Sequence, residues 1–396
     1  MKILTALLSV LFASTSFSQT LQNDNGWRPA WGLDRIDQRE AELNDTYNYT
    51  LTGAGVSVYV FDSGINSSHE EFTGRIEPGF NVINDAYGTE DCSGHGSHTA
   101  SLIGGTTYGV AKQVKLIPVR VLNCRSGNSS SATLYTAINW VIEHHQTGVP
   151  AIINLSVGMS KSIAFNEAAQ ALIADGLIVV GAAGNQNRDA CLYSPASEPS
   201  VISVGGIDRA ALRASYSNYG SCVDIFAPGS DLVGAWFGST NIYRSSSGTS
   251  NAAPIVSGIV ALMLQDNPSL TQSQVEERLK TNATRDVLFN IGSGSQNLLA
   301  YSLFDSSSPA PTTTVPVTTT TIPVTTTTTP TVVVTTTTVA PQPTTRMPIL
   351  KSTRPTIPIP ADMTCTNAGA RIYFYNVPYV CSSGRWLLGA YSPGRP

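Results

Sequence analysis

Residues 55–279 alternate between two kinds of hydrophobic pattern. Short continuous apolar runs, typical of buried strands, cover residues 55–62, 114–122, 151–156, 177–183, 201–204 and 223–226. Segments with helical length and spacing lie between or after them, at residues 99–104, 132–145, 163–174, 255–264 and 270–279. Strands that alternate with helices predict an α/β fold, with a mostly parallel sheet covered by helices on both faces.

The helical run at 255–264 is preceded by Ser247-Gly248-Thr249-Ser250-Asn251-Ala252-Ala253-Pro254. Glycine and hydroxyl residues suit a helix N-terminus, and we expect Pro254 in the first turn, where a missing N–H costs little. A serine there has its hydroxyl at the positive end of the helix dipole, beside free backbone N–H groups. By itself the stretch fits a helix cap better than a nucleophile, because capping serines are far commoner than nucleophiles.

The N-terminus has the pattern of a secretory signal peptide. Met1-Lys2 precedes an apolar run from Ile3 to Phe12, and small polar residues follow to Gln19. We therefore predict a signal peptide over 1–18, cleaved near Ser18, and a secreted, extracellular protein. No other stretch is long enough to span a membrane.

The composition argues against two classes of binding partner, nucleic acids and zinc. The net charge is −4 and only 13% of residues are charged, which argues against nucleic-acid binding. The chain has six cysteines and no C-x-x-C pair, so an exported protein with disulfides is favoured over a zinc site.

The composition changes after residue 305. Residues 306–360 are mostly Thr, Pro and Val, which resembles an O-glycosylated mucin-like linker. Residues 361–396 form a small tail with several aromatic residues, too short to fold without a staple, so we expect a Cys365–Cys381 bridge. The linker as an inert spacer and the tail as a glycan- or surface-binding patch both remain open. The main domain is expected at 19–305.

Four chemically distinct side chains fall next to the ends of predicted elements. Asp62 ends a strand, Asn185 follows another, His95 lies on the turn before a helix, and Ser250 heads a helix. In open parallel sheets, active residues gather at the carboxyl ends of strands. Acyl transfer needs these four types: a nucleophile, a base, a carboxylate that orients the base, and an amide that donates to the oxyanion.

Three blocks around these residues resemble the signatures of subtilisin-like serine proteases, the peptidase S8 family. They are Val58–Ile65, Gly94–His98 and Gly248–Ser250. Four further segments are similar to the proteinase K branch: 31–37, 193–201, 217–220 and 291–295. The likeness covers about residues 27–304 and implies a subtilisin-like three-layer fold.

The resemblance implies a serine endopeptidase that hydrolyses polypeptides through an acyl-enzyme on Ser250. His95 would be the base, Asp62 would hold its tautomer, and Asn185 with the Ser250 N–H would bind the oxyanion. His98 matches the family's second, structural histidine. We expect a monomer.

The resemblance also implies a substrate cleft. Its predicted lining is Ser126, Gly127, Asn154, Leu155, Ser156, Val157, Gly158, Ala182, Ala183 and Gly184. Ser126 and Gly127 belong to the edge that would pair with the substrate backbone. Because the remaining residues carry no charge, we expect a broad preference for apolar or aromatic P1 side chains.

Disulfides and calcium follow from the same resemblance. Cys92–Cys124 and Cys191–Cys222 would form the bridges of the aqualysin-like members. A structural calcium would be held by the carbonyls of Pro199 and Val201 and the carboxylate of Asp224. The alternative for Asp224 is an ordinary loop acid. A second calcium site resembles one in aqualysin-like relatives, at Asp34, Asp37 and Gln38, although Asn44 stands where those relatives carry a carboxylate.

The sequence departs from the family pattern in several places. Asn251 replaces the usual methionine after the nucleophile, and we expect a modulated rate rather than a loss. Ser101 replaces a glycine and Ile255 a histidine, and both are interpreted as packing changes. Residues 19–28 cannot form the family's pro-domain of roughly 80–100 residues, so we expect a propeptide or inhibitor in trans, another folding aid, or a truncated sequence. A catalytically silent binding or adhesion protein is the alternative function.

Overall fold

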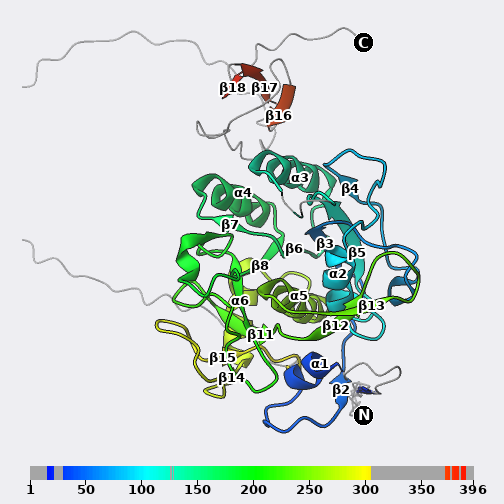
Figure 1. The fold of residues 1–396 in the computed structure, drawn as a ribbon, viewed down its shortest axis with the longest axis vertical. Helices are drawn as coiled ribbons and strands as arrows, with labels where there is room; N and C mark the ends of the chain where they lie inside the picture. The colour runs from blue at the N-terminus through cyan, green and yellow to red at the C-terminus, as the bar shows by residue number, and fades with distance from the viewer. Residues whose placement is uncertain are drawn as a thin grey trace, which may run out of the picture.

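The fold is an α/β sandwich built on a single large sheet (Figure 1). The computed structural model describes residues 16–21, 30–124, 127, 129–304, 371–374, 377–382 and 385–388. Within these residues strands and helices alternate from β3 to β8, apart from the short strands β4 and β7, as the hydrophobic pattern predicts; β9 to β13 then follow one another before α5. The α/β fold with a mostly parallel sheet is therefore confirmed.

The main sheet has nine strands in the order β14-β15-β11-β10-β8-β6-β3-β5-β4. Their bounds are β3 (Ser57–Asp62), β4 (Phe80–Asn81), β5 (Lys115–Arg120), β6 (Ala151–Leu155), β8 (Ile178–Ala182), β10 (Ile202–Ile207), β11 (Ile225–Pro228), β14 (Thr284–Arg285) and β15 (Leu298–Leu299). All neighbours pair in parallel except β14 with β15. The carboxyl ends of β3, β6 and β8 thus meet at one edge.

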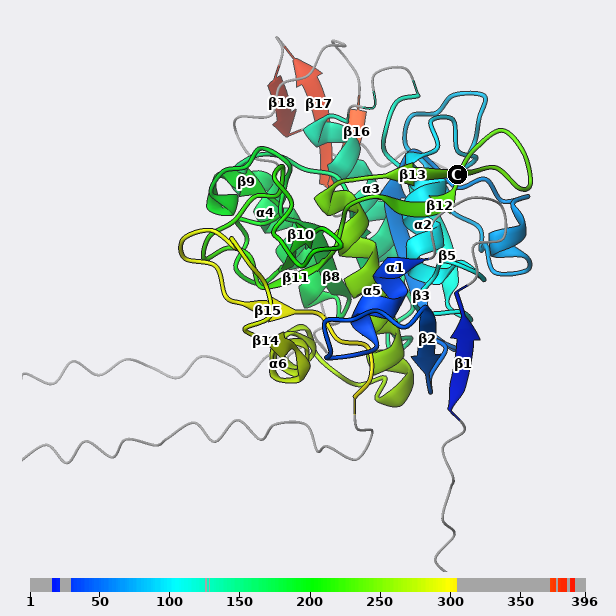
Figure 2. The same ribbon diagram turned by 60° about the horizontal axis from the view of Figure 1, so that its bottom comes forward.

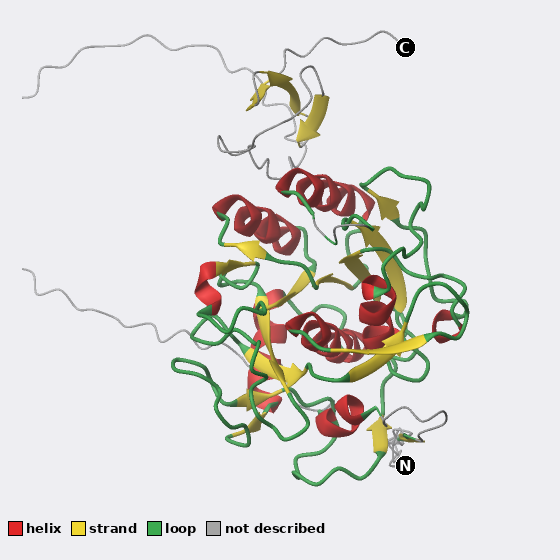
Figure 3. Ribbon diagram, in the orientation of Figure 1, coloured by secondary structure: helices red, strands yellow, loops and turns green. Residues whose placement is uncertain are grey.

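Helices cover both faces of this sheet (Figure 3). They are α1 (Trp31–Ile36), α2 (His95–Gly104), α3 (Ser131–His144), α4 (Ile163–Ala174), α5 (Thr249–Asp266) and α6 (Gln272–Asn282), with short 3₁₀ turns η1 (Glu70–Phe72) and η2 (Ala190–Leu192). The apolar residues of α2 and α5 share one core cluster, and those of α3 and α4 share the other. The layers are therefore helix, sheet, helix.

Side chains along each central strand alternate between the two clusters. Val58 and Val60 lie in the α2–α5 cluster, whereas Tyr59 and Phe61 lie in the α3–α4 cluster. Successive side chains of a strand point to opposite faces, so a strand covered on both sides must be apolar at every position. This is why the strands read as continuous apolar runs.

Smaller elements surround the sandwich. Two antiparallel pairs are β1 (Phe17–Thr20) with β2 (Thr46–Tyr49), and β12 (Leu232–Ala235) with β13 (Tyr243–Ser246). A third joins β7 (Met159–Ser160) to β9 (Tyr193–Ser194). Figure 2 shows β1 and β2 side by side at the lower edge of the domain. The predicted cleavage point near Ser18 falls inside β1.

Two sequence-based boundaries were wrong. Helix α2 begins at His95 itself and not after a turn, because Gly94 is the N-cap. Helix α5 begins at Thr249, so Pro254 lies beyond the first turn and not within it. The predicted linker at 306–360 and most of the tail at 361–396, with Cys365, lie outside the described residues. In the tail, β16 (Arg371–Phe374), β17 (Val377–Ser382) and β18 (Arg385–Leu388) form an antiparallel sheet.

Among the helices that the structure describes, none is both long and apolar enough to cross a bilayer.

Candidate active site

Asp62 and His95 form a close pair at the carboxyl edge of the sheet. His95 Nδ1 lies 2.7 Å from Asp62 Oδ1 and 2.8 Å from Asp62 Oδ2. Asp62 is fully buried, and its Oδ1 also accepts the backbone N–H of Ser63 at 2.7 Å. A Cβ on Gly96 would lie 2.0 Å from the carbonyl of Gly64. Only glycine therefore lets α2 approach the end of β3 closely enough for this contact.

The pair favours the protonated imidazole. Burial by itself disfavours a charged ring, but the negative charge of Asp62 and its hydrogen bond outweigh burial. Asp91 adds to the effect, and the net result is that the pKa of His95 is raised above 6.5. Since Asp62 accepts from Nδ1, the other ring nitrogen is left for a second partner.

Ser250 is the second residue of α5, and its own carbonyl is bound from the neighbouring strand. Pro254 has no N–H, so the carbonyl four residues earlier, that of Ser250, loses its helical donor. Ser156 Oγ donates to this oxygen at 2.9 Å. Ser156 follows β6 and is in turn linked to Asn154, whose Nδ2 donates to its hydroxyl at 2.9 Å. The proline is thus accommodated by a tertiary contact that holds the front of α5.

Asn185 lies beside Ser250, and hydrogen bonds to its side-chain oxygen fix the orientation of its amide group. Asn185 Oδ1 accepts from both the N–H and the hydroxyl of Thr249, at 2.8 Å each. A Cβ on Gly248 would lie 2.8 Å from Ser250 Oγ, 3.4 Å from Asn185 Nδ2 and 3.6 Å from Ser250 N. The missing side chain of Gly248 therefore leaves a space bordered by a hydroxyl and two N–H donors.

A cavity of about 140 Å³ opens next to this space. Its lining is Ser156, Val157, Gly158, Met159, Ala182, Gly184, Asn185, Gln186, Tyr193, Ser194, Thr249 and Ser250. The predicted cleft residues Ser156, Val157, Gly158, Ala182 and Gly184 are among them. Among the residues that the structure describes, none of those lining this cavity is charged.

Other predicted cleft residues lie elsewhere. Asn154, Leu155 and Ala183 are buried and do not line the cavity; the Asn154 oxygen accepts from Ser257 Oγ at 2.9 Å. Gly127 is exposed and is not part of the lining, and Ser126 lies outside the described residues.

The sequence reasoning missed several lining residues, including Met159, Gln186 and Thr249. Thr249 could have been found from its place in the Gly248–Ser250 block. Met159 and Gln186 carry no such signal, because they reach the cavity through the fold of their loops. His98, predicted to be structural, is buried and its Nε2 lies 2.9 Å from the carbonyl of Leu232.

A larger cavity of about 570 Å³ lies at the opposite edge, at the amino ends of β6 and β8. His145 and Asp175 line it, and they contact each other at 2.9 Å. His145 Nε2 lies 3.0 Å from the carbonyl of Val149, so both ring nitrogens have partners. Neither Ser250 nor Asn185 reaches this cavity, so size alone does not identify the reactive site.

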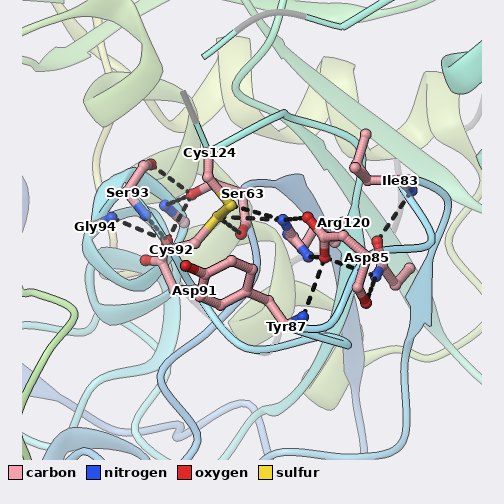
Figure 4. Close-up of a disulfide and its surroundings, with 12 residues drawn as sticks. Ser63, Ile83, Asp85, Tyr87, Asp91, Cys92, Ser93, Gly94, Arg120 and Cys124 are labelled. Carbon is pink, nitrogen blue, oxygen red and sulfur yellow. Dashed lines mark hydrogen bonds and ion pairs between the residues drawn. A yellow bond between two sulfur atoms is a disulfide. The ribbon is translucent and has the colours of Figure 1, made fainter. Parts of the chain in front are cut away.

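The disulfides Cys92–Cys124 and Cys191–Cys222 are present as predicted. Cys92–Cys124 joins the segment before α2 to the segment after β5. Figure 4 shows the Arg120 guanidinium between this bond and Asp85; Arg120 donates to Asp85 Oδ2 at 2.7 Å and to Cys124 Sγ at 2.8 Å. The hydrogen bonds from Arg120 lower the pKa of Asp85 to about 2. This network anchors the loop that leads to His95.

The predicted calcium site at Asp224 does not fit the contacts of that residue. Lys280 Nζ lies 2.8 Å from Asp224 Oδ1, and the N–H of Ser203 donates to Asp224 Oδ2 at 2.9 Å. Calcium needs carboxylate oxygens at about 2.3–2.6 Å, and an ammonium on the same oxygen would repel it. Both carboxylate oxygens of Asp224 therefore already have other partners.

The second predicted site fits a cation better. Within the described residues, Asp37 Oδ1 and Gln38 Oε1 are buried oxygens without a hydrogen-bond partner. Asp34 is fully buried nearby and accepts the backbone N–H groups of Asn44 and Asp45 at 3.2 and 2.7 Å. Burial raises the pKa of Asp37 to about 6. In the part of the chain that is described, no group of three or more His, Cys, Asp or Glu side chains could hold a metal, so any site here would need amide or carbonyl oxygens as well.

Comparison with known proteins identifies the fold family. Residues 53–302 match the Subtilase family. The chain belongs to this family. An extracellular serine proteinase from Thermus sp. (strain Rt41A) is 50% identical over 69% of the chain, and alkaline serine exoprotease A from Vibrio alginolyticus is 43% identical over 70%. The matches span 66% and 51% of those relatives' own lengths.

A solved structure agrees with this assignment. The crystal structure of a cold adapted subtilisin-like serine proteinase superposes with a TM-score of 0.66 at 43% identity, and covers 69% of this chain and 98% of that one. This subtilase therefore has the predicted three-layer fold. The two disulfides within the described residues agree with the aqualysin-type pattern that the resemblance implied.

Proposed function

We propose that this subtilase is a secreted serine endopeptidase in which Ser250 is the nucleophile and His95 the general base. The observation that carries the proposal is the space beside Gly248, which is bordered by Ser250 Oγ, Asn185 Nδ2 and the Ser250 N–H. A hydroxyl and two N–H donors around one small space are what a tetrahedral oxyanion requires. The Asp62–His95 pair supplies the oriented imidazole.

The proposed reaction begins when Ser250 Oγ attacks the substrate carbonyl carbon and its proton passes to His95 Nε2. The carbonyl electron pair moves to oxygen, and this oxyanion accepts from Asn185 Nδ2 and the Ser250 N–H. The C–N bond then breaks, and His95 returns the proton to the departing amine, leaving an acyl-enzyme. In the second half, water attacks the acyl carbon and gives a proton to His95. The bond between this carbon and Ser250 Oγ then breaks, His95 returns the proton to Oγ, and the carboxylic acid product leaves the free serine behind. Asp62 stabilises the imidazolium in both halves.

For the substrate, we infer a polypeptide with an apolar or aromatic P1 side chain. The cavity beside Ser250 is lined by small, apolar and neutral polar residues, with Met159 and Tyr193 as the largest. A charged P1 side chain would lose its hydration there without gaining an ion pair. The segment at Ser126–Gly127 is proposed to pair with the substrate backbone.

The experiment that tests this function is active-site labelling of the secreted protein. A fluorophosphonate probe should label the wild type, and Ser250→Ala should abolish the labelling while the circular dichroism spectrum stays unchanged. Ser257→Ala is a matched control in the same helix that should keep the label. A folded wild type that takes up no probe would instead indicate a silent binding protein.

We also propose that calcium binds at Asp34, Asp37 and Gln38, where it would satisfy the two buried oxygens without partners. The ion would be structural, and it takes no part in the reaction. A chelator should lower the melting temperature of the wild type but not that of Asp37→Asn. Equal chelator sensitivity of the two proteins would rule the site out.

A further inference from the structure

Lys280 is one of the residues that attach helix α6 to the sheet, together with Gln272, whose side chain bonds to the backbone of Val179 and Ser200. Lys280 Nζ lies 2.8 Å from Asp224 Oδ1 and 2.5 Å from Glu276 Oε1, one turn earlier in the same helix. Asp224 directly precedes β11, and it is tied to β10 through the N–H of Ser203. The side chains of Lys280, Asp224 and Glu276 are 25%, 16% and 24% exposed, so water reaches the group only in part.

The ammonium of Lys280 lies where the sequence analysis predicts a calcium ion. Asp224 is the only carboxylate of the predicted Pro199–Val201–Asp224 calcium site. Lys280 supplies a positive charge to this carboxylate from within the chain, and Glu276 holds the ammonium from the other side. A divalent ion on the same oxygen would lie next to the ammonium, and the two cations would repel each other.

The charge of Lys280 is stabilised by these contacts. Its ammonium donates hydrogen bonds to the carboxylates of both Asp224 and Glu276. A metal ion dissociates at low concentration, whereas a tethered cation does not.

We propose that Lys280 replaces calcium at Asp224, so that α6 is held against β10 and β11 by a covalently tethered cation. This edge of the sheet then keeps its stability in the absence of calcium. The proposal is independent of catalysis, since Asp224 precedes β11 and bonds to Ser203 and Lys280, whereas Ser250 lies in α5. Any calcium dependence of the protein must then come from elsewhere, such as Asp37.

The test compares melting temperatures with excess calcium and with chelator in an Asp37→Asn background, which removes the other proposed site. The background should show no difference between the two conditions. Adding Lys280→Met should lower its melting temperature by at least about 3 °C in chelator. Calcium should restore part of that loss, because Asp224 and Glu276 are then unpaired. Lys115→Met is the matched control: Lys115 contacts Glu77 at 2.8 Å, but both side chains are more than 40% exposed.

Two results would overturn the proposal. A chelator-sensitive background would mean that Asp224 holds a metal, and a Lys280→Met variant as stable as the Lys115→Met control would mean that the lysine is an ordinary surface pair. If the Asp37→Asn background fails to fold, terbium titration of the otherwise unaltered protein decides the question. Asp224→Asn should leave the number of bound terbium ions unchanged, and the loss of one ion would refute the replacement.

Discussion

The side chain of Asn185 is oriented by hydrogen bonds from its neighbour Thr249. Thr249 occupies its side-chain oxygen twice, which directs the amide N–H group toward the space beside Gly248. We expect Asn185→Ala to lower kcat by roughly 10²–10³-fold, or about 3–4 kcal/mol in the barrier, with little change in KM. Peptide hydrolysis kinetics measure both constants. A proportional rise in KM at constant kcat would show that Asn185 binds substrate rather than the oxyanion.

The raised pKa of His95 predicts how the activity falls on the acid side of its pH profile. The base must be neutral to accept a proton, and Asp62 raises its pKa above 6.5. Activity should therefore fall as the pH falls through a value higher than 6.5, measured as kcat/KM against pH. Because the folded state raises this pKa, the protonated ring stabilises the fold at low pH, and this contribution is lost as the pH rises through the raised pKa.

The contact with Asp62 also predicts a rate effect: Asp62→Asn should lower the rate by roughly 10⁴-fold. An acid limb at or below pH 6.5 would contradict the effect of Asp62.

Replacing Asn251, next to the nucleophile, with an apolar residue should stabilise the protein. It is 1% exposed, and within the described residues neither its Oδ1 nor its Nδ2 has a hydrogen-bond partner. A buried polar group without a partner costs roughly 1–3 kcal/mol. Asn251→Leu has a similar shape and should raise the free energy of unfolding by an amount of this order, measured by urea denaturation. Asn251→Ala serves as the control, since it leaves a cavity. A less stable Leu variant would show that the amide is satisfied in solution.

At the scale of elements, the sequence located the central strands and the middle of each long helix, but not the ends near the site. Helix α4 has the expected limits, and strand β3 ends at Asp62 as expected but begins two residues later than predicted. Each is defined by a local apolar pattern. Helix α5 begins earlier than its apolar run, because Ser156 compensates for Pro254 from another strand. Helix α1 gave no signal, although all six of its residues are buried, because six residues are too few for a helical period to appear.

The contact between α2 and α5 depends on a glycine inside a helix. A Cβ at Gly258 would lie 2.5 Å from Val110 Cβ and 3.1 Å from the carbonyl of Ile103. Gly258→Ala gains about 1 kcal/mol in helix propensity, but overpacking costs typically 1–3 kcal/mol. We expect a lower melting temperature, measured by calorimetry. Glu277→Ala, at an exposed position of α6, is the control and should be neutral. A stabilised Gly258→Ala would mean that the two helices can separate.

At the scale of the whole molecule, the site is assembled at one edge of the main sheet, where the carboxyl ends of its central strands lie. Parallel pairing brings the carboxyl ends of β3, β6 and β8 together, and with them Asp62, Ser156 and Asn185. The front ends of α2 and α5 meet this edge with His95 and Ser250. The positive ends of both helix dipoles then face the place where negative charge would develop.

The buried core predicts where the stable domain ends. The buried apolar residues of the described chain lie between Leu21 and Ala300, and Phe304 packs on Arg278 of α6. A chain ending at Phe304 should melt within about 2 °C of the full chain. A chain ending at Gln296 loses β15, with Leu298 and Leu299 buried in the core, and should melt well below it. Equal loss in both truncations would show that residues after 304 stabilise the domain.

The sequence by itself determined the α/β fold, the order of the core elements, and the residues Asp62, His95, Asn185 and Ser250 as one candidate set. It could do so because strand periodicity and short motifs are local properties. Only the tertiary structure decided that Asn154 is buried and does not line the cavity, that Met159 and Gln186 line it, and that Lys280 binds Asp224. These contacts join residues far apart in the chain, and no local pattern encodes which loop end or helix face will meet which partner.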